Sequence, residues 1–511
     1  FEGEEPRIGV FVCNCGANIG GVVDVPAVAD YARGLPCVVY SEENLFSCSQ
    51  DNQERMKHAI AEHRLNRVVV ASCSPRTHEP LFQETLQGCG LNKYLFEMAN
   101  IRDQDSWVHG DAPETATIKA RDLVRMAVAR AGLLKPLKEK RIPVNQRALI
   151  IGGGVAGMTA ALALGNQGFE SLIVEKEAEL GGLSRELTTT LEGEDIPIYL
   201  SGLIEEVSSH PRIQVLTGSL VVGFGGFKGN FTTEVLVGPG MYERKIDHGV
   251  TVLATGAQEY RPREYLYGED ERVLTQIELG QRVDQKGADD LQTVVMIQCV
   301  GSRNEENPNC SRVCCQTAVK NAIHIKELNP NAEVWILYRD IRTYGLMEEY
   351  YREARRQGVL FSRFSTEAPP EVRSRPEGIM VRFPDHVLGR DIEVLADILA
   401  LSAGMVPSDT EELANILKVS RNEDGYLMEA HAKLRPVDMA SDGVFLCGTA
   451  QGPKLISESI AQALAAASRA ATFLSKGEIT LSAVTASVDE DRCAACLICV
   501  KACPYGIPRI N

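Results

Sequence analysis

Short apolar runs alternate with longer stretches of mixed polarity through the first 100 positions of the chain. The runs that predict strands are RIGVFV (7–12), VVY (38–40), RVVVAS (67–72) and YLFEMA (94–99). Between two of them, DNQERMKHAIAEH (51–63) has the polarity pattern of a surface helix. Because strands that alternate with helices form parallel sheets, this part of the chain predicts a small parallel α/β domain.

The pattern changes after a charged helix predicted over 114–134 and a polar linker over 135–146, which predict a domain boundary. From Arg147, the sequence RALIIGGGVAGMTAALALGNQGFESLIVEKE predicts a strand, a glycine turn, a helix and a second strand. Antiparallel strands are expected over 213–253, and a further α/β stretch is expected from about 290 to 400. The segments 397–407 and 442–471 then predict a return to the unit that begins at Arg147.

Length, charge and cysteine content narrow the class of protein. A chain of 511 residues can bury several cores without disulfide bonds, and its 15 cysteines are clustered, which argues against a secreted disulfide framework and for a reducing, cytoplasmic setting. The net charge of -16 argues against a nucleic-acid partner. Since no run approaches about 18 consecutive apolar residues, no membrane span is expected.

The glycine turn carries the first chemical signal. Gly152, Gly154 and Gly157 fit the spacing G-x-G-x-x-G, in which a tight turn and a helix N-terminus receive a pyrophosphate. Glu175 ends the second predicted strand, where a ribose hydroxyl needs an acceptor. The alternative is a glycine-rich turn without a ligand, but its position between two strands favours a dinucleotide site.

Two later motifs decide between FAD and NAD. TVLATGA (251–257) and DGVFLCGTA (442–450), after the glycine turn, resemble the motifs of thioredoxin-reductase-like flavoproteins, which have two dinucleotide-binding domains. The resemblance implies FAD, with further contacts from Lys176, Gly182, Thr255, Gly256, Gly448 and Thr449. In that family the last motif usually ends in Gly-Asp, so Thr449 stands where a carboxylate is expected.

Cysteines replace the second nucleotide fingerprint. The strand VVMIQ runs into Cys299 without a second G-x-G-x-x-G, so a nicotinamide site is not expected there. Cys310, Cys314 and Cys315 open the next predicted helix and meet Cys299 at one edge of the domain. Four thiolates at one point can bind a [4Fe–4S] cluster or zinc. Buried structural cysteines and a vicinal Cys314–Cys315 dithiol are the alternatives.

CVGSR followed by CSRVCC within a flavin domain resembles the A-type subunit of heterodisulfide reductase. The resemblance implies that Cys299, Cys310, Cys314 and Cys315 are ligands of a cluster beside the flavin. Lys320 follows on the same predicted helix, and we expect it to reach the flavin and stabilise its reduced form through a charge-assisted hydrogen bond. The alternative is a solvated helix lysine.

The N-terminal domain fits the same family, since FVCNCGANI, YSEENLFSCS and VVVASCSPRTHEP resemble its opening segments. Cys13, Cys15, Cys48 and Cys73 each follow a predicted strand of a parallel sheet, so they can meet at one edge and bind a second [4Fe–4S] cluster. Cys37 and Cys89 are expected to be packing residues.

The tail carries the most specific motif. Cys493, Cys496, Cys499 and Cys503-Pro504 give C-x₂-C-x₂-C-x₃-C-P, the spacing of bacterial ferredoxins, in which the fourth cysteine binds another cluster. No cysteine follows before Asn511, so we expect either a chain cut within a ferredoxin module or an unusual completion. The ferredoxin module that family members often insert into the flavin domain is not expected here, because residues 183–250 contain no cysteine.

The sequence thus predicts an α/β protein: an N-terminal parallel cluster domain, a thioredoxin-reductase-like FAD fold with two dinucleotide-type domains, and a partial ferredoxin module. The expected boundaries are an N-terminal iron–sulfur domain (1–140), an FAD domain (147–288 and 399–475), a NAD-like domain rebuilt around a [4Fe–4S] cluster (289–398) and the ferredoxin module (485–511).

The resemblance implies a role in electron transfer. Such a protein bifurcates electron pairs between a high-potential acceptor and ferredoxin, within a complex of B-type and C-type subunits and a hydrogenase, formate or NADH-linked module. A homodimer of the A-type subunit is expected in that complex. The alternatives are a flavoprotein that distributes electrons without bifurcation, a dithiol/disulfide reductase using Cys314 and Cys315, and a non-catalytic scaffold with a structural FAD.

Overall fold

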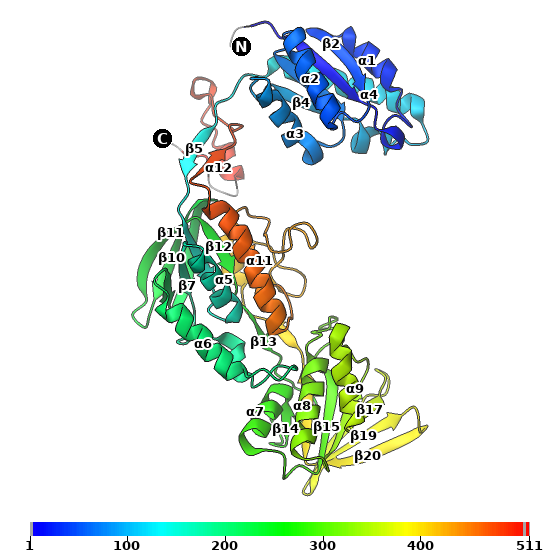
Figure 1. The fold of residues 1–511 in the computed structure, drawn as a ribbon, viewed down its shortest axis with the longest axis vertical. Coiled ribbons are helices and arrows are strands. Elements are labelled where there is room, and N and C mark those ends of the chain that lie inside the picture. Colours follow the sequence, from blue (N-terminus) through cyan, green and yellow to red (C-terminus); the bar gives the residue numbers. More distant parts are fainter. Residues whose placement is uncertain (1–3, 504–506, 510–511) are drawn as a thin grey trace. The chain divides into compact units, whose positions relative to one another are not determined.

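The computed structural model describes residues 4–503 and 507–509. The chain forms two compact units (Figure 1): unit 1 comprises Phe1–Arg141 and Thr480–Asn511, and unit 2 comprises Ile142–Ile479. The strands β5 (Lys140–Pro143) and β24 (Glu478–Leu481) run across the two boundaries between the units.

Unit 1 is built on a parallel sheet with the order β2-β1-β3-β4. Its strands are β1 (Ile8–Cys13), β2 (Val38–Asn44), β3 (Arg67–Ser72) and β4 (Phe96–Asn100). Its helices are α1 (Val25–Arg33), α2 (Gln50–Glu62), α3 (Pro75–Gly88) and α4 (Pro113–Leu133). Helices α1 and α4 pack on one face and α2 and α3 on the other, so every residue of β1 and β3 is buried. The parallel α/β domain predicted from the sequence is confirmed.

Unit 2 contains two parallel sheets, each with five strands. The first, the glycine-motif sheet, has the order β23-β12-β6-β7-β8. Its strands are β6 (Arg147–Ile151), β7 (Glu170–Val174), β8 (Ile213–Leu216), β12 (Val250–Leu253) and β23 (Val444–Leu446). Helices α5 (Val155–Asn166), α6 (Ile196–Ser209) and α11 (Ile456–Leu474) cover one face, and Figure 1 shows α5 and α11 side by side.

An antiparallel sheet of β9 (Ser219–Phe227), β10 (Asn230–Val237) and β11 (Tyr242–His248) covers the other face. The prediction of antiparallel strands over 213–253 is therefore right for these three and wrong at both ends. Strands β8 and β12 pair in parallel with β7 and β6. Alternation of apolar residues shows which face of a strand is buried, but it does not show the direction of its neighbour.

The second parallel sheet of unit 2, the cysteine-motif sheet, has the order β14-β21-β15-β16-β17. Its strands are β14 (Val273–Thr275), β15 (Thr293–Val300), β16 (Glu333–Tyr338), β17 (Leu360–Arg363) and β21 (Ile398–Ala403). Helices α7 (Gln276–Lys286), α8 (Cys314–Leu328) and α9 (Glu348–Arg356) accompany it. An apolar core between α7, α8 and this sheet buries Leu279, Val319 and Met296.

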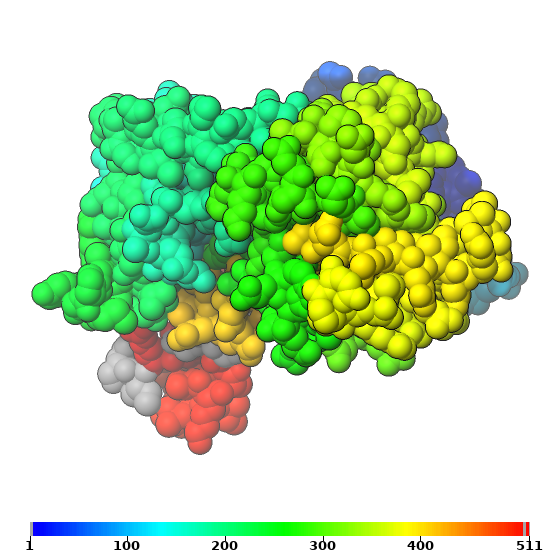
Figure 2. Space-filling view, turned by 90° about the horizontal axis from the view of Figure 1, so that it is seen from below, coloured from blue at the N-terminus to red at the C-terminus, as the bar shows by residue number. Residues whose placement is uncertain are grey.

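Strands β18 (Glu371–Arg375), β19 (Gly378–Asp385) and β20 (Arg390–Ala396) form an antiparallel sheet on the opposite face of the cysteine-motif sheet. Figure 2 shows this segment in yellow beside the green surface of the same domain. The sequence predicts a continuous α/β stretch from about 290 to 400, so the antiparallel pairing of these three strands differs from that prediction.

Two short segments join the domains of unit 2. Strand β13 (Ala257–Glu259) leaves the glycine-motif sheet and pairs antiparallel with β22 (Met405–Pro407), which leaves the cysteine-motif sheet. The remaining helices are α10 (Glu411–Leu417) and α12 (Ile498–Ala502). Among the described residues, no helix combines the length and the apolar content that a membrane crossing requires.

Candidate functional site

The flavin motifs converge at the carboxyl edge of the glycine-motif sheet. Strand β6 leads into Gly152, β7 into Glu175, β12 into Thr255 and β23 into Gly448 within one or two residues of each strand end. Thr449 is close to the second motif, since its Oγ1 lies 3.8 Å from the position of a Cβ on Gly256. Because all these strands are parallel, the residues share one edge of the sheet, where α/β proteins bind nucleotides.

Two glycines of the turn are required by sterics. Gly152 has φ +110°, and a Cβ there would lie 2.2 Å from the carbonyl oxygen of Ala254. A Cβ on Gly157 would lie 1.9 Å from the carbonyl oxygen of Gly152. A Cβ on Gly154 would instead enter open space, with no atom within 4 Å. The turn is thus closely packed on its protein side and open at the N-terminus of α5.

Glu175 is fixed beside this turn. Its Oε2 accepts a hydrogen bond from the Gly153 backbone N–H at 2.5 Å, and its Oε1 accepts one from the Glu177 N–H at 2.8 Å. Gly182 begins a short 3-10 helix directly after Gly181, whose N–H donates to the Gly153 carbonyl at 2.9 Å. Lys176 is different: its side chain is largely exposed and pairs with Glu177 at 3.6 Å, so no contact brings it to the turn.

These residues fit a bound FAD. Helix α5 begins after Gly154 without a side-chain cap, so its first N–H groups are available to phosphate oxygens. The Thr255 hydroxyl is buried without a hydrogen-bond partner, as expected of a group that waits for a ligand. The donor set and the open position at Gly154 therefore match the dinucleotide that the three motifs imply.

A cavity of about 430 Å³ lies between the glycine-motif and the cysteine-motif sheets. The segment around Thr189 and the start of α11, with Lys454, form one side. The start of α8, with Cys314, Gln316 and Lys320, forms the other. Its lining is mainly apolar with a few polar groups, which is typical of cofactor pockets.

Lys320 and Glu259, which both line the cavity, have pKa values displaced toward neutral pH. Burial lowers the pKa of Lys320 to about 8, although the Asp284 carboxylate acts in the opposite direction. The Lys320 Nζ donates to the Thr189 carbonyl at 3.2 Å. Burial raises the pKa of Glu259 to about 7. Lys320 is therefore half-buried and lines the cavity.

Sequence reasoning missed three residues of this cavity: Glu259, Gln316 and Lys454. Gln316 is buried at 1% exposure, and neither its amide oxygen nor its amide nitrogen has a hydrogen-bond partner. Lys454 lies two residues before α11, and burial lowers its pKa. Of these three residues, only Lys454 has a signal in the sequence: it lies shortly after Thr449 of the last flavin motif.

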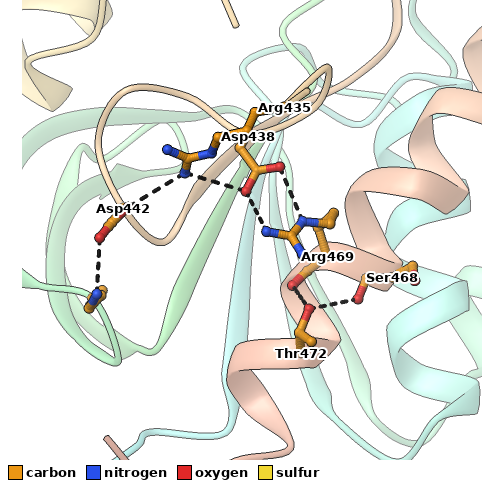
Figure 3. A network of polar contacts seen from close by, with 7 residues as sticks. Arg435, Asp438, Asp442, Ser468, Arg469 and Thr472 are labelled. Atoms are coloured by element: carbon orange, nitrogen blue, oxygen red, sulfur yellow. Dashed lines mark hydrogen bonds and ion pairs between the residues drawn. The ribbon is translucent and has the colours of Figure 1, made fainter. Parts of the chain in front are cut away.

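A salt-bridge network joins α11 to the segment that precedes β23 (Figure 3). The Asp438 side chain is 4% exposed, and its two oxygens accept hydrogen bonds from the Arg469 guanidinium at 3.0 and 3.2 Å. Arg435 pairs with the same carboxylate at 3.5 Å. Since Arg469 belongs to α11, the network ties this helix to the strand β23 segment.

The second cysteine set, here called the α8 cysteine group, consists of Cys299, Cys310, Cys314 and Cys315. Cys299 lies near the end of β15 with φ +62°, and Cys314 and Cys315 begin α8. The Cys310 Sγ accepts a hydrogen bond from the Arg312 N–H at 3.3 Å. Arg303 contacts the Cys299 Sγ at 3.8 Å and pairs with Asp340 at 2.7 Å.

The thiols of the α8 cysteine group influence one another. Burial raises the pKa of Cys315 to about 11, and Cys299 and Cys310 add to the shift. Burial also raises the pKa of Cys314, with contributions from Cys315, Cys299 and Cys310. Metal binding displaces the protons of cysteine thiols, and four neighbouring cysteines can supply the thiolates of an iron–sulfur cluster, so this donor set fits such a cluster.

The N-terminal cysteine group consists of Cys13, Cys15, Cys48 and Cys73 at the carboxyl edge of the unit 1 sheet. Burial and the Cys13 thiol raise the pKa of Cys15 to about 11, and Cys73 contributes. Burial likewise raises the pKa of Cys73, with a contribution from Cys48, while Arg102 lowers it. The sheet therefore brings these four thiols together, as their positions after the strands predict.

The two cysteines expected to pack behave differently. Cys89 is half-buried against the core under α2 and α3. The expectation for Cys37 is wrong: this residue is exposed with φ +65°, because it lies in the turn that precedes β2.

Within residues 4–503 and 507–509, no three His, Cys, Asp or Glu side chains have the spacing of ligands to one metal ion.

The C-terminal motif surrounds α12. Cys493, Cys496 and Cys499 are exposed, Cys503 is half-buried, and the Cys503 N–H donates to the Cys499 carbonyl at 3.1 Å. Pro504, the last residue of the motif, lies outside the described residues.

Two segments of the chain match known protein families. Residues 146–300 match the family described as pyridine nucleotide-disulphide oxidoreductase, which implies FAD, and residues 486–509 match the 4Fe-4S binding domain, which implies a [4Fe–4S] cluster. The parallel sheets and these two matches confirm the predicted fold class. T. acidophilum thioredoxin reductase, a solved structure, aligns with a TM-score of 0.45 at 17% identity, over 64% of this chain and 98% of its own.

Two curated relatives cover nearly the whole chain. One of the A-type iron-sulfur subunits of CoB–CoM heterodisulfide reductase from Methanopyrus kandleri is 40% identical over 98% of this chain and 91% of its own length. The A-type subunit of the H(2):CoB-CoM heterodisulfide,ferredoxin reductase from Methanothermobacter thermautotrophicus is 39% identical over 98% and 90%. Both alignments extend over 598 residues, more than the 511 of this chain, so the relatives contain residues that it lacks. The chain therefore belongs to the family of A-type heterodisulfide reductase subunits and is an oxidoreductase.

Proposed function

We propose that this chain is the FAD and [4Fe–4S] electron-transfer subunit of a heterodisulfide-reductase-type complex. FAD binds at the carboxyl edge of the glycine-motif sheet, with its pyrophosphate at the N-terminus of α5. The α8 cysteine group and the N-terminal cysteine group each bind one [4Fe–4S] cluster, and the cysteines around α12 belong to a ferredoxin-type site.

One observation carries this proposal: Cys314 belongs to the α8 cysteine group and also lines the cavity. A cluster held by Cys314 would border the space that the flavin ring occupies, so electrons could cross without a mobile carrier. Lys320 follows on the same helix and lines the same cavity.

The side chains of the cavity prepare it for a reduced cofactor. FAD, when bound, supplies the exchange between two-electron and one-electron transfer. Lys320 offers a cation to the negative charge that reduction creates, and burial strengthens this interaction. Glu259, with a pKa of about 7, can hold a proton in the same cavity near neutral pH.

The function extends to bifurcation and to partners. Names of relatives, such as the A-type subunit of the H(2)/formate:CoB-CoM heterodisulfide,ferredoxin reductase from Methanococcus maripaludis, describe those proteins as parts of enzymes that act on a heterodisulfide and ferredoxin. For this chain we propose B-type and C-type subunits, a hydrogenase, formate or NADH-linked module, and ferredoxin as partners, with two copies of the chain in the complex. The flavin would divide electron pairs between a high-potential acceptor and ferredoxin.

The first test is the content of iron, acid-labile sulfide and FAD in anaerobically purified protein. Two complete four-iron sites predict about eight irons per FAD, besides iron at the C-terminal motif. FAD with little iron would contradict the proposal, and bleaching of that flavin by NADPH would favour the dithiol reductase. Bifurcation is tested in the assembled complex: ferredoxin must be reduced only while the high-potential acceptor is also reduced.

A further inference from the structure

A single arginine joins the α8 cysteine group to the opposite wall of the cavity. The backbone N–H of Arg312 donates to the Cys310 Sγ at 3.3 Å. Its guanidinium extends the other way, donating to the Pro453 carbonyl at 3.2 Å and to the Glu458 Oε2 at 2.6 Å. The main chain of Arg312 is thus bound to the cysteine loop, and its side chain is bound to the segment that begins α11.

Glu458 transmits this contact to the start of the helix. The same Oε2 accepts a hydrogen bond from the Leu455 N–H at 2.9 Å, and Oε1 accepts one from the Tyr344 hydroxyl at 3.1 Å. The Arg312 guanidinium also lies 5.5 Å from the centre of the Tyr344 ring. Glu458 therefore caps α11 and binds Arg312 with one carboxylate.

Both ends of this pair adjoin the cavity lining. Val313 and Cys314 follow Arg312 in sequence, and Lys454 and Leu455 lie shortly before Glu458. Arg312 and Glu458 are not themselves lining residues, so the pair fixes the distance between two walls from behind.

The backbone of Arg312 supports a positioning role. Arg312 has φ +50°, a left-handed conformation that costs a non-glycine residue energy and persists only where several contacts hold it. Ordinary stabilisation is a weaker explanation for the pair. The two side chains are 39% and 31% exposed, and ion pairs near the surface contribute little to folding.

We propose that Arg312 and Glu458 act as a positioning pair that makes FAD binding depend on the occupancy of the α8 cysteine group. When a cluster holds Cys310 in place, Arg312 holds the start of α11 and Lys454 against the cavity. Without the cluster the loop relaxes and the wall is released. This inference rests on the proposed function and adds a communication path to it.

The test measures the dissociation constant of FAD for the full-length protein, loaded with iron or depleted of it. Arg312→Gln and Glu458→Gln should each raise the constant about tenfold, and the double variant should match the single variants within about twofold, because the two residues act as one unit. Arg312→Lys should restore little of the FAD affinity, because a lysine ammonium cannot bind the Pro453 carbonyl and the Glu458 carboxylate together as a planar guanidinium does. Arg382→Gln is the matched control: it breaks the surface ion pair with Asp391 on the antiparallel sheet of the cysteine-motif domain. Neither residue lines the cavity or belongs to the cysteine group, so FAD affinity should stay unchanged.

Iron depletion supplies the second arm. It should raise the dissociation constant of FAD about tenfold in the wild-type protein. In the Arg312→Gln variant, the logarithm of this change should be less than half as large. Unchanged FAD affinity in both single variants, multiplicative effects in the double variant, or an equal effect of iron removal in both backgrounds would overturn the inference while leaving the proposed function intact. A wild-type protein that binds neither FAD nor iron would overturn both.

Discussion

Glu259 and Lys320 line the same cavity, and their pKa values are displaced toward each other. Burial raises the pKa of Glu259 to about 7 and lowers that of Lys320 to about 8. The two residues come from different elements, β13 and α8, in the two domains of unit 2. Neutral and charged forms of both side chains are therefore accessible near physiological pH, which is a common property of sites that handle protons or charge.

Glu259→Gln should change how stability depends on pH. The folded-state pKa of Glu259 is raised above its usual 4.5, so the folded protein binds more protons than the unfolded chain between about pH 4.5 and 7. The wild-type protein therefore loses stability as pH rises through this window. The variant lacks this loss and should be more stable at pH 7.5 by about 3 kcal/mol, given 1.36 kcal/mol for each pKa unit.

Urea unfolding of the protein without FAD at pH 4.5, 6 and 7.5 measures this effect. Glu269→Gln is the control. Glu269 is an exposed carboxylate between β13 and β14, and its removal should leave the dependence of stability on pH unchanged. A Glu259→Gln profile parallel to that of the wild-type protein would show that the carboxyl is not protonated in this window.

Lys320→Met should make the bound flavin harder to reduce. The ammonium favours the negative charge of the reduced cofactor, and a loss of about 1.4 kcal/mol lowers a two-electron potential by about 30 mV. The pKa of Lys320 is lowered to about 8, so the side chain is charged below this pH and neutral above it. The difference in potential between the two proteins should thus be largest at pH 6 to 7 and small at pH 10.

Lys326→Met is a suitable control for this measurement. Lys326 lies on the same helix, but its Nζ donates to the Ala332 carbonyl at 3.0 Å and it does not line the cavity. Spectroelectrochemical titration of the bound FAD checks both variants. Equal potentials for Lys320→Met and the wild-type protein would place Lys320 away from the flavin.

The sequence predicted the positions of motifs at sheet edges better than it predicted the cavity. Cys13 ends β1 and Cys73 follows β3, its parallel neighbour, so chain direction alone places them at the same edge. Gln316 and Glu259 could not be recognised in this way. Each becomes a cavity residue only because segments far apart in the sequence pack together, and no local pattern contains that information.

Strand direction and turn conformation explain the two predictions that the structure corrects. Strand β8 has the apolar content of a sheet strand, but the direction of its neighbour depends on the crossover through α6. Cys37 lies next to an apolar strand, yet its left-handed turn points it to solvent. Side-chain direction at a turn follows from backbone conformation, which composition does not reveal.

Single cysteine substitutions should show that the α8 cysteine group and the N-terminal cysteine group each bind their own cluster. Cys310→Ala and Cys15→Ala should each remove about four irons per chain, because loss of one ligand destabilises a whole cluster. Cys37→Ala is the control and should retain all iron, since Cys37 is exposed and outside both groups. Iron content, together with low-temperature electron paramagnetic resonance of the reduced proteins, measures the loss. If Cys37→Ala loses iron and Cys15→Ala does not, the assignment of the N-terminal group is wrong.

Gly157→Ala should abolish FAD binding, whereas Gly202→Ala should leave it unchanged. A Cβ on Gly157 would lie 1.9 Å from the Gly152 carbonyl oxygen, so the turn and α5 must separate. The N–H groups that face the pyrophosphate then move, and we expect FAD affinity to fall more than a hundredfold, or about 2.7 kcal/mol.

In Gly202→Ala the new Cβ meets no atom within 4 Å and lies inside α6, where alanine is the better helix former by about 1 kcal/mol. FAD binding followed by flavin fluorescence should thus separate the two variants, and thermal unfolding should show Gly202→Ala to be at least as stable as the wild-type protein. If Gly157→Ala binds FAD with wild-type affinity, the pyrophosphate does not lie against this turn, and the dinucleotide site must be placed elsewhere.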